Sequence, residues 1–135
     1  MAAKNVKKVD TRGQVLLLPG PKLVELEKDL QDRIRLAVSA SGVLLFRNNV
    51  GLAQYRDAKV KYGLGKGSSD LVGVVGPHGR FLAIEVKRAK GGKVSPQQER
   101  WLKWVRLYGG VSGVAKSVDE AMKLVEEARK PVGWS

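Results

Sequence analysis

The sequence predicts one mixed α/β domain, and three observations lead to this prediction. The chain has 135 residues, which is the length of one ordinary domain. Its segments alternate between the helical period of 3.6 residues and short apolar runs that are typical of strands. Their order is α-β-β-β-α-β-α without an internal repeat, which favours a mixed central sheet flanked by helices.

The composition narrows the classes of protein to which the chain can belong. Apolar residues make up 43% of the chain, enough for a hydrophobic core, and there is no cysteine. The absence of cysteine excludes disulfides and thiolate metal sites and fits a reducing compartment. His78 is the single histidine, so a zinc site with several histidines is excluded. No apolar run reaches about 18 residues, and the N-terminus lacks the apolar core of a secretory signal, so we expect a cytoplasmic protein.

The charge balance points to a polyanionic partner. The chain carries 25 Lys and Arg residues against 13 Asp and Glu residues, a net charge of +12. This excess favours nucleic acid as the partner, although charge alone also suits a merely soluble basic protein. A membrane surface is disfavoured, because no helix sets a purely basic face against an aromatic one.

The N-terminal residues 1–21 are expected to form a tail or an added strand, and residues 22–135 form the domain proper. The apolar run 15–21 (VLLLPGP) is followed by a stop signal. It could pair with a sheet edge or with a second subunit.

Residues 22–42 predict the first helix, which Gly42 ends. Its apolar stripe comprises Leu23, Leu26, Leu30, Ile34, Ala37 and Val38. On a helical wheel Glu27 falls inside this stripe, whereas Glu25 falls almost opposite, on the solvated face. Glu27 is therefore the unusual residue of this helix.

The middle of the chain predicts three strands and one long loop. Residues 43–48 (VLLFRN) form a short apolar strand. The segment 49–69 is long, basic and rich in glycine, and we expect a functional or disordered loop there. Strands at 70–75 and 80–87 flank the turn signal GPHG at 76–79.

Residues 95–110 form a helix with strong capping signals. Ser95 is the predicted N-cap, Pro96 occupies the first helical position, and Gln98 completes a capping box. Gly109-Gly110 ends this helix.

The C-terminal part completes the α-β-β-β-α-β-α order. The run VSGVA at 111–115 predicts a strand. A last helix follows at 117–128, where Ser117 and Glu120 form a second predicted capping box.

The strand 80–87 carries two ionisable residues on one of its faces. Side chains alternate along a strand, so Glu85 and Lys87 share a face with Phe81 and Ala83. Two charged groups therefore project side by side from an otherwise apolar strand.

The register of the hairpin decides what these groups meet. If the loop is centred on Pro77-His78, Asp70 lies opposite Glu85, with Cβ atoms roughly 5 Å apart. Two carboxylates this close are destabilising unless a cation neutralises them; Lys87 does so in part, and Mg²⁺ or Mn²⁺ would do so better. A three-residue loop with a bulge at Gly79 is an alternative that would shift the pairing by one residue. In a purely structural interpretation, Asp70 caps a strand and Glu85 forms an ordinary ion pair with Lys87.

The same residues carry a resemblance to a known family. Asp70 followed by Glu85-Val86-Lys87 resembles the motif of the PD-(D/E)xK nucleases, with Ser69 in place of the usual proline. The surrounding segments resemble the virus-type replication-repair nuclease domain, VRR-Nuc, from about Glu27 to Val125. These segments are FRNNVG, YGLGKGSSDLVGVV, FLAIEVKRAKGGKVSPQQERWL and GGVSGVAKSVDEAMKLV.

The resemblance implies a restriction-endonuclease-like core and a metal-dependent DNA endonuclease that hydrolyses phosphodiester bonds with Mg²⁺ or Mn²⁺. By this resemblance the metal ligands are Glu27, Asp70, Glu85 and the backbone carbonyl of Val86. Lys87 matches the catalytic lysine of the family. Gln98 matches a glutamine that points towards the site, although it also fits a role in the capping box alone.

Two basic loops and one polar segment are expected to contact DNA. The loop 63–69 (GLGKGSS) resembles a phosphate-binding loop, but it is not a Walker A motif because a strand follows it. The loop 87–93 (KRAKGGK) directly follows the catalytic strand. The expected DNA contacts are Arg47, Asn48, Asn49, Lys66, Ser68, Ser69, Arg88, Lys90 and Lys93.

The resemblance also implies finer properties. Stand-alone members of the family are typically small homodimers that act on branched DNA such as four-way junctions, which suggests a phage or prophage source and the host cytoplasm. A catalytically silent DNA-binding or assembly module is one alternative, which the intact acidic, lysine and glutamine set disfavours. An RNA endonuclease is the other, because the sequence does not separate RNA from DNA.

Overall fold

The computed structural model describes residues 7–9, 15–17 and 25–132. Strands β1 (Lys7–Val9) and β2 (Val15–Leu17) pair antiparallel in a two-stranded sheet of their own. Within the described residues the apolar run after residue 14 thus pairs with the chain's own N-terminal segment. The rest of this segment and the start of the predicted first helix lie outside the described residues.

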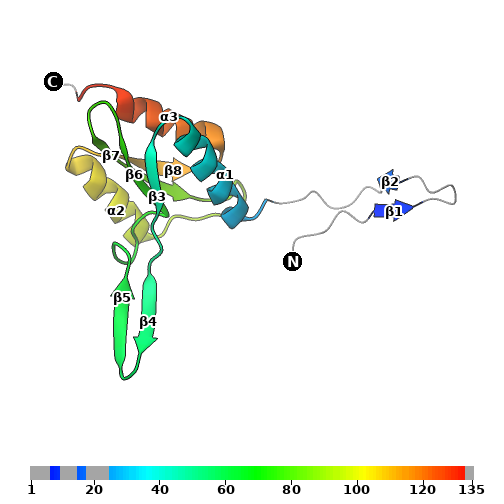
Figure 1. The fold of residues 1–135 in the computed structure, drawn as a ribbon, viewed down its shortest axis with the longest axis horizontal. Coiled ribbons are helices and arrows are strands. Elements are labelled where there is room, and N and C mark those ends of the chain that lie inside the picture. The colour runs from blue at the N-terminus through cyan, green and yellow to red at the C-terminus, as the bar shows by residue number, and fades with distance from the viewer. Residues whose placement is uncertain (1–6, 10–14, 18–24, 133–135) are drawn as a thin grey trace.

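Four strands form the central sheet, in the order β3-β6-β7-β8 (Figure 1). Their bounds are β3 Leu44–Arg47, β6 Leu71–Val75, β7 Arg80–Val86 and β8 Val111–Ala115. Strands β3, β6 and β7 pair antiparallel in turn, whereas β8 runs parallel to β7. The prediction of a mixed sheet is confirmed.

Helices cover both faces of this sheet, as predicted. Their bounds are α1 Glu27–Ala40, α2 Pro96–Leu107 and α3 Val118–Arg129. Helices α1 and α3 share one hydrophobic core with the sheet. Helix α2 lies on the other face, where the Ser112 hydroxyl donates to the Leu102 carbonyl at 2.6 Å. Ser112 pairs with Ala83, so this second face is also the face of Glu85.

The hydrophobic core follows from the periodicity of its elements. Helix α1 contributes three side chains one turn apart, and β7 contributes alternate residues. The main buried members are Leu30, Ile34, Val38, Leu71, Val75, Leu82, Ile84, Val86, Val111, Ala115, Ala121, Val125 and Ala128. Burial of each large aliphatic side chain contributes roughly 1.5–3 kcal/mol.

The first helix is shorter than the sequence predicts. It begins at Glu27, because the preceding Leu26 has extended backbone, and no side-chain cap supports this end. Leu26 is exposed and does not belong to the buried stripe. Glu25 reaches forward to Arg33 instead, in two hydrogen bonds of 2.6 and 2.7 Å. Gly42 follows the end of the helix with a φ of 94°, as expected of a C-terminal glycine.

The later helices begin where their capping residues predict. At α2 the reciprocal bonds between Ser95 and Gln98 complete the predicted capping box. At α3 the Ser117 hydroxyl accepts from the Glu120 N–H at 3.1 Å, but the Glu120 carboxylate accepts from the Lys116 N–H instead of closing the box. No helix within residues 25–132 has the length and apolar character needed to cross a membrane.

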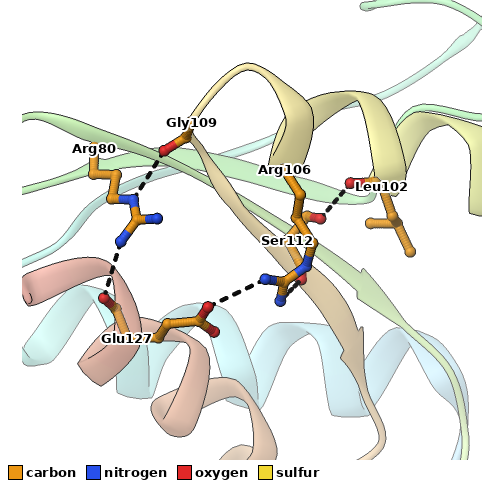
Figure 2. A network of polar contacts seen from close by, with 6 residues as sticks. All are labelled: Arg80, Leu102, Arg106, Gly109, Ser112 and Glu127. Carbon is orange, nitrogen blue, oxygen red and sulfur yellow. Dashed lines mark hydrogen bonds and ion pairs between the residues drawn. The ribbon is translucent and has the colours of Figure 1, made fainter. Parts of the chain in front are cut away.

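A polar network joins α2, α3 and β8 to Arg80 at the start of β7 (Figure 2). Arg80 donates to the carbonyls of Gly109 at 2.9 Å and Glu127 at 3.3 Å. Arg106 pairs with the Glu127 carboxylate at 3.1 Å and donates to the Ser112 carbonyl. This network holds the two outer layers in place around the sheet.

A protruding hairpin replaces the long loop that the sequence predicts at 49–69. Strands β4 (Gly51–Tyr55) and β5 (Ala58–Tyr62) pair antiparallel and project away from the core (Figure 1). The prediction failed because the connecting pair Arg56-Asp57 lacks the Asn-Gly or Asp-Gly signature of a tight turn. Arg56 takes a φ of 55°, which is uncommon outside glycine. The order of the main fold is therefore α-β-β-β-β-β-α-β-α, with two strands more than predicted.

Candidate active site

The register of the β6–β7 hairpin brings Asp70 beside Glu85. Leu71 pairs with Ile84, so Asp70, one residue before β6, comes next to Glu85. The predicted pairing is thus confirmed, and the alternative three-residue loop does not form. The Asp70 carboxylate accepts a hydrogen bond of 2.8 Å from the backbone N–H of Val86. This bond fixes the Asp70 side chain against the end of β7.

Glu85 is a buried carboxylate with two polar neighbours. Only 1% of the residue is exposed. Its Oε1 lies 3.7 Å from Nζ of Lys87 and accepts a hydrogen bond of 3.0 Å from Nε2 of Gln98. Its Oε2 is buried without a hydrogen-bond partner in the described part of the chain. Lys87 itself is held in place, since its side chain is only 12% exposed.

The electrostatics of this site disfavour the charged form of Glu85. Burial, followed by the neighbouring Asp70 carboxylate, raises the pKa of Glu85 from 4.5 to about 8. The charge of Lys87 acts in the opposite direction, and the charge of Glu27 adds a smaller upward effect. In the absence of a further cation, the site therefore favours a proton on Glu85 at neutral pH.

Gln98 performs both of the roles that the sequence left open. Its carbonyl oxygen accepts from the backbone N–H of Ser95 at 2.9 Å, which belongs to the cap of α2. Its amide nitrogen donates to Glu85. A single side chain thus joins the first turn of α2 to the buried carboxylate.

The donor set fits a divalent cation in part. Asp70 and Glu85 offer adjacent carboxylate oxygens, one of which lacks a partner among the described residues. The N–H of Val86 points to Asp70, and in extended backbone the carbonyl of the same residue points to the same side. Glu27, at the start of α1, is half-buried, and its charge reaches Glu85. Within the described residues, however, no three acidic or histidine side chains gather closely enough to hold a metal ion.

Asn48 organises the loop that leads to Asp70. Its amide nitrogen donates to the Ser68 hydroxyl at 2.7 Å and to the Ser69 carbonyl at 2.8 Å. Its amide oxygen accepts from the N–H of Leu64 at 3.1 Å. The backbone N–H of Asn48 also donates to the Asp70 carbonyl at 2.8 Å. Asn48 therefore positions the acidic residue from both its side chain and its backbone.

We expect replacement of Asn48 by alanine to destabilise the protein by about 1–3 kcal/mol, because several polar groups lose their partner. Denaturant unfolding measures this change in the free energy of unfolding. Asn49→Ala is the matched control; this neighbour is exposed, so the expected effect is about 0.5 kcal/mol or less. Equal effects of the two substitutions would contradict the positioning role of Asn48.

Ser69 does not fit the predicted contact with a DNA phosphate. The residue is fully buried. Its hydroxyl donates to the Leu71 carbonyl at 3.1 Å and accepts from the indole N–H of Trp101 at 3.2 Å. Ser69 thus ties the loop before Asp70 to α2, and the structure corrects this part of the prediction.

A pocket of about 450 Å³ opens beside Asp70. Its walls are Gln31, Arg47, Asn48, Asn49, Val50, Tyr62, Ser68 and Asp70. The structure therefore brings together four of the expected DNA contacts with one of the acidic residues. Gln31 was missed by the sequence reasoning, although it lies one helical turn after Glu27.

The remaining basic candidates do not line this pocket. Lys66, Arg88, Lys90 and Lys93 are all exposed. A side chain at Gly92 would approach Cβ of Lys87 to 3.0 Å. The loop after β7 thus folds back closely over the lysine of the site.

The fold and the site together define a class of protein. The mixed sheet with helices on both faces carries a carboxylate pair and a half-buried lysine at the end of β7, and together with the family match below it is a nuclease-type α/β fold. The chain belongs to the VRR-NUC domain family, whose model matches residues 20–119. This match confirms the family resemblance seen in the sequence.

Comparison with solved structures agrees with this assignment. One similar structure, described as a VRR_NUC domain, has 25% sequence identity to the chain and a TM-score of 0.51. The similarity covers 74% of this chain and 94% of the other. Among curated proteins, none matches the chain.

Proposed function

We propose that the chain is a metal-dependent DNA endonuclease that hydrolyses phosphodiester bonds, with structure-selective action on branched DNA. The observation that carries this proposal is the buried Glu85, whose Oε2 lacks a partner among the described residues while Asp70 and Lys87 lie beside it. Two adjacent carboxylates are an unfavourable arrangement for stability alone. The same pair of carboxylates is a favourable arrangement for binding a cation that the reaction needs.

Each residue of the site has a role that follows from its position. Asp70, Glu85 and the Val86 carbonyl would hold Mg²⁺ or Mn²⁺, with Glu27 contributing from the start of α1. When bound, such an ion lowers the pKa of a water molecule and neutralises charge on the phosphate. Lys87 is held near Glu85 and can direct its ammonium group towards an attacking water or the developing negative charge.

The groups around the metal ligands act by positioning. Gln98 holds Glu85 through one hydrogen bond, and the Val86 N–H holds Asp70. Such support restricts the ligands to one arrangement before the substrate arrives. The pocket beside Asp70 offers Arg47 and Asn49, both exposed, to the phosphate backbone of the strand to be cut.

The overall charge supports DNA as the substrate. The net charge of +12 provides attraction to a phosphate backbone. The exposed Lys66, Arg88, Lys90 and Lys93 extend this attraction around the site. Contacts of this kind position the duplex without reading its sequence, which agrees with selection by DNA structure.

An exposed apolar surface supports the proposal of a homodimer. On the face that α2 covers only in part, Leu44 and Val74 pair with each other and are 60% and 41% exposed. Val74 in turn pairs with Phe81, which lines a groove of about 350 Å³ together with the 54% exposed Trp104. Large exposed apolar patches mark interaction sites, and a two-fold dimer would present two sites to a four-way junction.

The proposal is tested by incubating the protein with a four-way junction, a matched linear duplex, single-stranded DNA and a matched RNA. Each substrate is tested with Mg²⁺, with Mn²⁺ and with EDTA. We expect metal-dependent cutting of the junction, and a mass of two chains in light scattering. Junction binding without cleavage in either metal would favour a silent binding module, and cutting of the RNA alone would assign an RNA endonuclease.

A further inference from the structure

The β4–β5 hairpin is exposed along nearly its whole length. All residues from Leu52 to Tyr62 are exposed. Within the described residues, neither strand packs extensively against another helix or strand, and Figure 1 shows the hairpin projecting from the core. A two-stranded hairpin alone is at best marginally stable in water. A binding partner would therefore account for its presence.

The hairpin has two chemically different faces. Its register pairs Ala53 with Val60 and Tyr55 with Ala58, so these side chains form one apolar face. The opposite face carries Lys59 and Lys61, together with Leu52 and Gln54. The basic side chains are thus aligned along one side of the ribbon.

The root of the hairpin lies at the candidate active site. Val50, which precedes β4, and Tyr62, which ends β5, both line the pocket that contains Asp70. At this end the ring of Tyr62 lies over Gly51, where any larger side chain would collide with it. The root of the hairpin is therefore part of the pocket wall, and a nucleic acid longer than the pocket could reach the ribbon.

The charge of the hairpin selects among its potential partners. Arg56, Lys59 and Lys61 are opposed by a single acidic residue, Asp57. Two copies of the hairpin packed on each other would bring their own like charges together, because Lys59 and Lys61 lie on one face. Duplex DNA supplies the complementary charge. Five residues of strand span roughly 16 Å at about 3.3 Å per residue, and a two-stranded ribbon fits the major groove of B-DNA.

We propose that the β4–β5 hairpin is a DNA-binding arm that grips the duplex next to the cleaved strand. This inference rests on the proposed nuclease function. Lys59 and Lys61 neutralise phosphates of the flanking duplex, and Arg56, whose guanidinium lies 5.6 Å from the centre of the Tyr55 ring, adds positive charge at the tip. The arm adds affinity for the duplex arms of a junction without contributing to the chemistry at Glu85 and Lys87.

The test compares two double variants of the full chain that remove the same charge. Lys59→Ala/Lys61→Ala alters the arm. Lys123→Ala/Lys130→Ala is the control, since these lysines are exposed on and just after α3. Fluorescence anisotropy measures the binding of a labelled four-way junction in EDTA over a range of salt concentrations. Thermal unfolding checks that both variants keep the fold.

We expect the arm variant to bind about tenfold more weakly than the control at physiological salt. The slope of log Kobs against log salt concentration should decrease in magnitude by about 2, one for each phosphate contact.

If wild type binds the junction but the arm variant behaves as the control does, the arm inference fails and the nuclease proposal stands. If Tyr55→Ser/Val60→Ser converts a dimer to a monomer while Lys59→Ala/Lys61→Ala leaves DNA affinity unchanged, the hairpin binds a second copy instead. Absence of any DNA binding by wild type overturns both proposals.

Discussion

Replacing Lys87 by alanine is expected to lower the rate of junction cleavage by about 10²- to 10³-fold, the typical loss when one preorganised electrostatic group is removed. The Lys87 side chain is only 12% exposed, and its Nζ lies 3.7 Å from the Glu85 carboxylate. Its charge is therefore poorly screened by water and directed into the site. Single-turnover cleavage of a labelled junction at saturating Mg²⁺ measures the chemical step.

The matched control for this prediction is Lys103→Ala, because Lys103 is an exposed lysine of α2. Its removal should leave the rate within about threefold of wild type, since removal of an exposed surface charge has a small effect. Junction binding in EDTA should remain measurable in both variants. A Lys87→Ala protein that cuts at the rate of the control would exclude Lys87 from the chemistry.

Replacing Glu85 by glutamine is expected to stabilise the metal-free protein near pH 8 and to abolish its stabilisation by metal. Burial and the Asp70 charge raise the pKa of Glu85 to about 8 in the folded state. Because the pKa of Glu85 is higher in the folded state than in the unfolded state, the folded state holds this proton more tightly. The stabilisation from this proton is complete below about pH 4.5 and is lost as the pH rises through 8. In EDTA the free energy of unfolding of wild type should fall by up to about 1.4 kcal/mol per pH unit across this interval.

The glutamine variant lacks this titration, so the corresponding part of its pH dependence should disappear. The measurement is thermal unfolding between pH 5 and about 8.5, in EDTA and with added Mn²⁺. Wild type should regain stability with Mn²⁺ at the upper end, because a bound cation neutralises the carboxylate pair. An equal Mn²⁺-induced shift of the unfolding temperature in wild type and Glu85→Gln would show that Glu85 holds no metal.

The core of the site could be predicted because it depends on strand periodicity. A loop centred on Pro77-His78 fixes the β6–β7 register, and this register alone places Asp70 beside Glu85. The glutamine of α2 was also found, because Ser95 and Gln98 have the spacing of a capping box. Its second contact, with Glu85, could not be derived from that spacing, since it depends on how α2 packs on the sheet.

The parts that sequence did not predict depend on contacts between distant segments. Ser69 resembles an exposed loop serine, but Trp101, far along the chain, buries it and binds its hydroxyl. Gln31 resembles any polar residue of a helix surface, and only the approach of the loop before β6 makes it part of a pocket. In the hairpin, Arg56 occupies a turn position that sequence preferences assign to other residues.

The double contact of Gln98 limits which mutations the chain can tolerate. A capping box ordinarily accepts either glutamate or glutamine at its third helical position. Here glutamate would bring a third carboxylate against Glu85, which already accepts a hydrogen bond from this side chain and lies beside Asp70. Smaller residues would keep neither contact. The amide of Gln98 is therefore required both by the cap of α2 and by the charges of the site. Selection for a stable helix and selection for an intact site thus restrict the same residue.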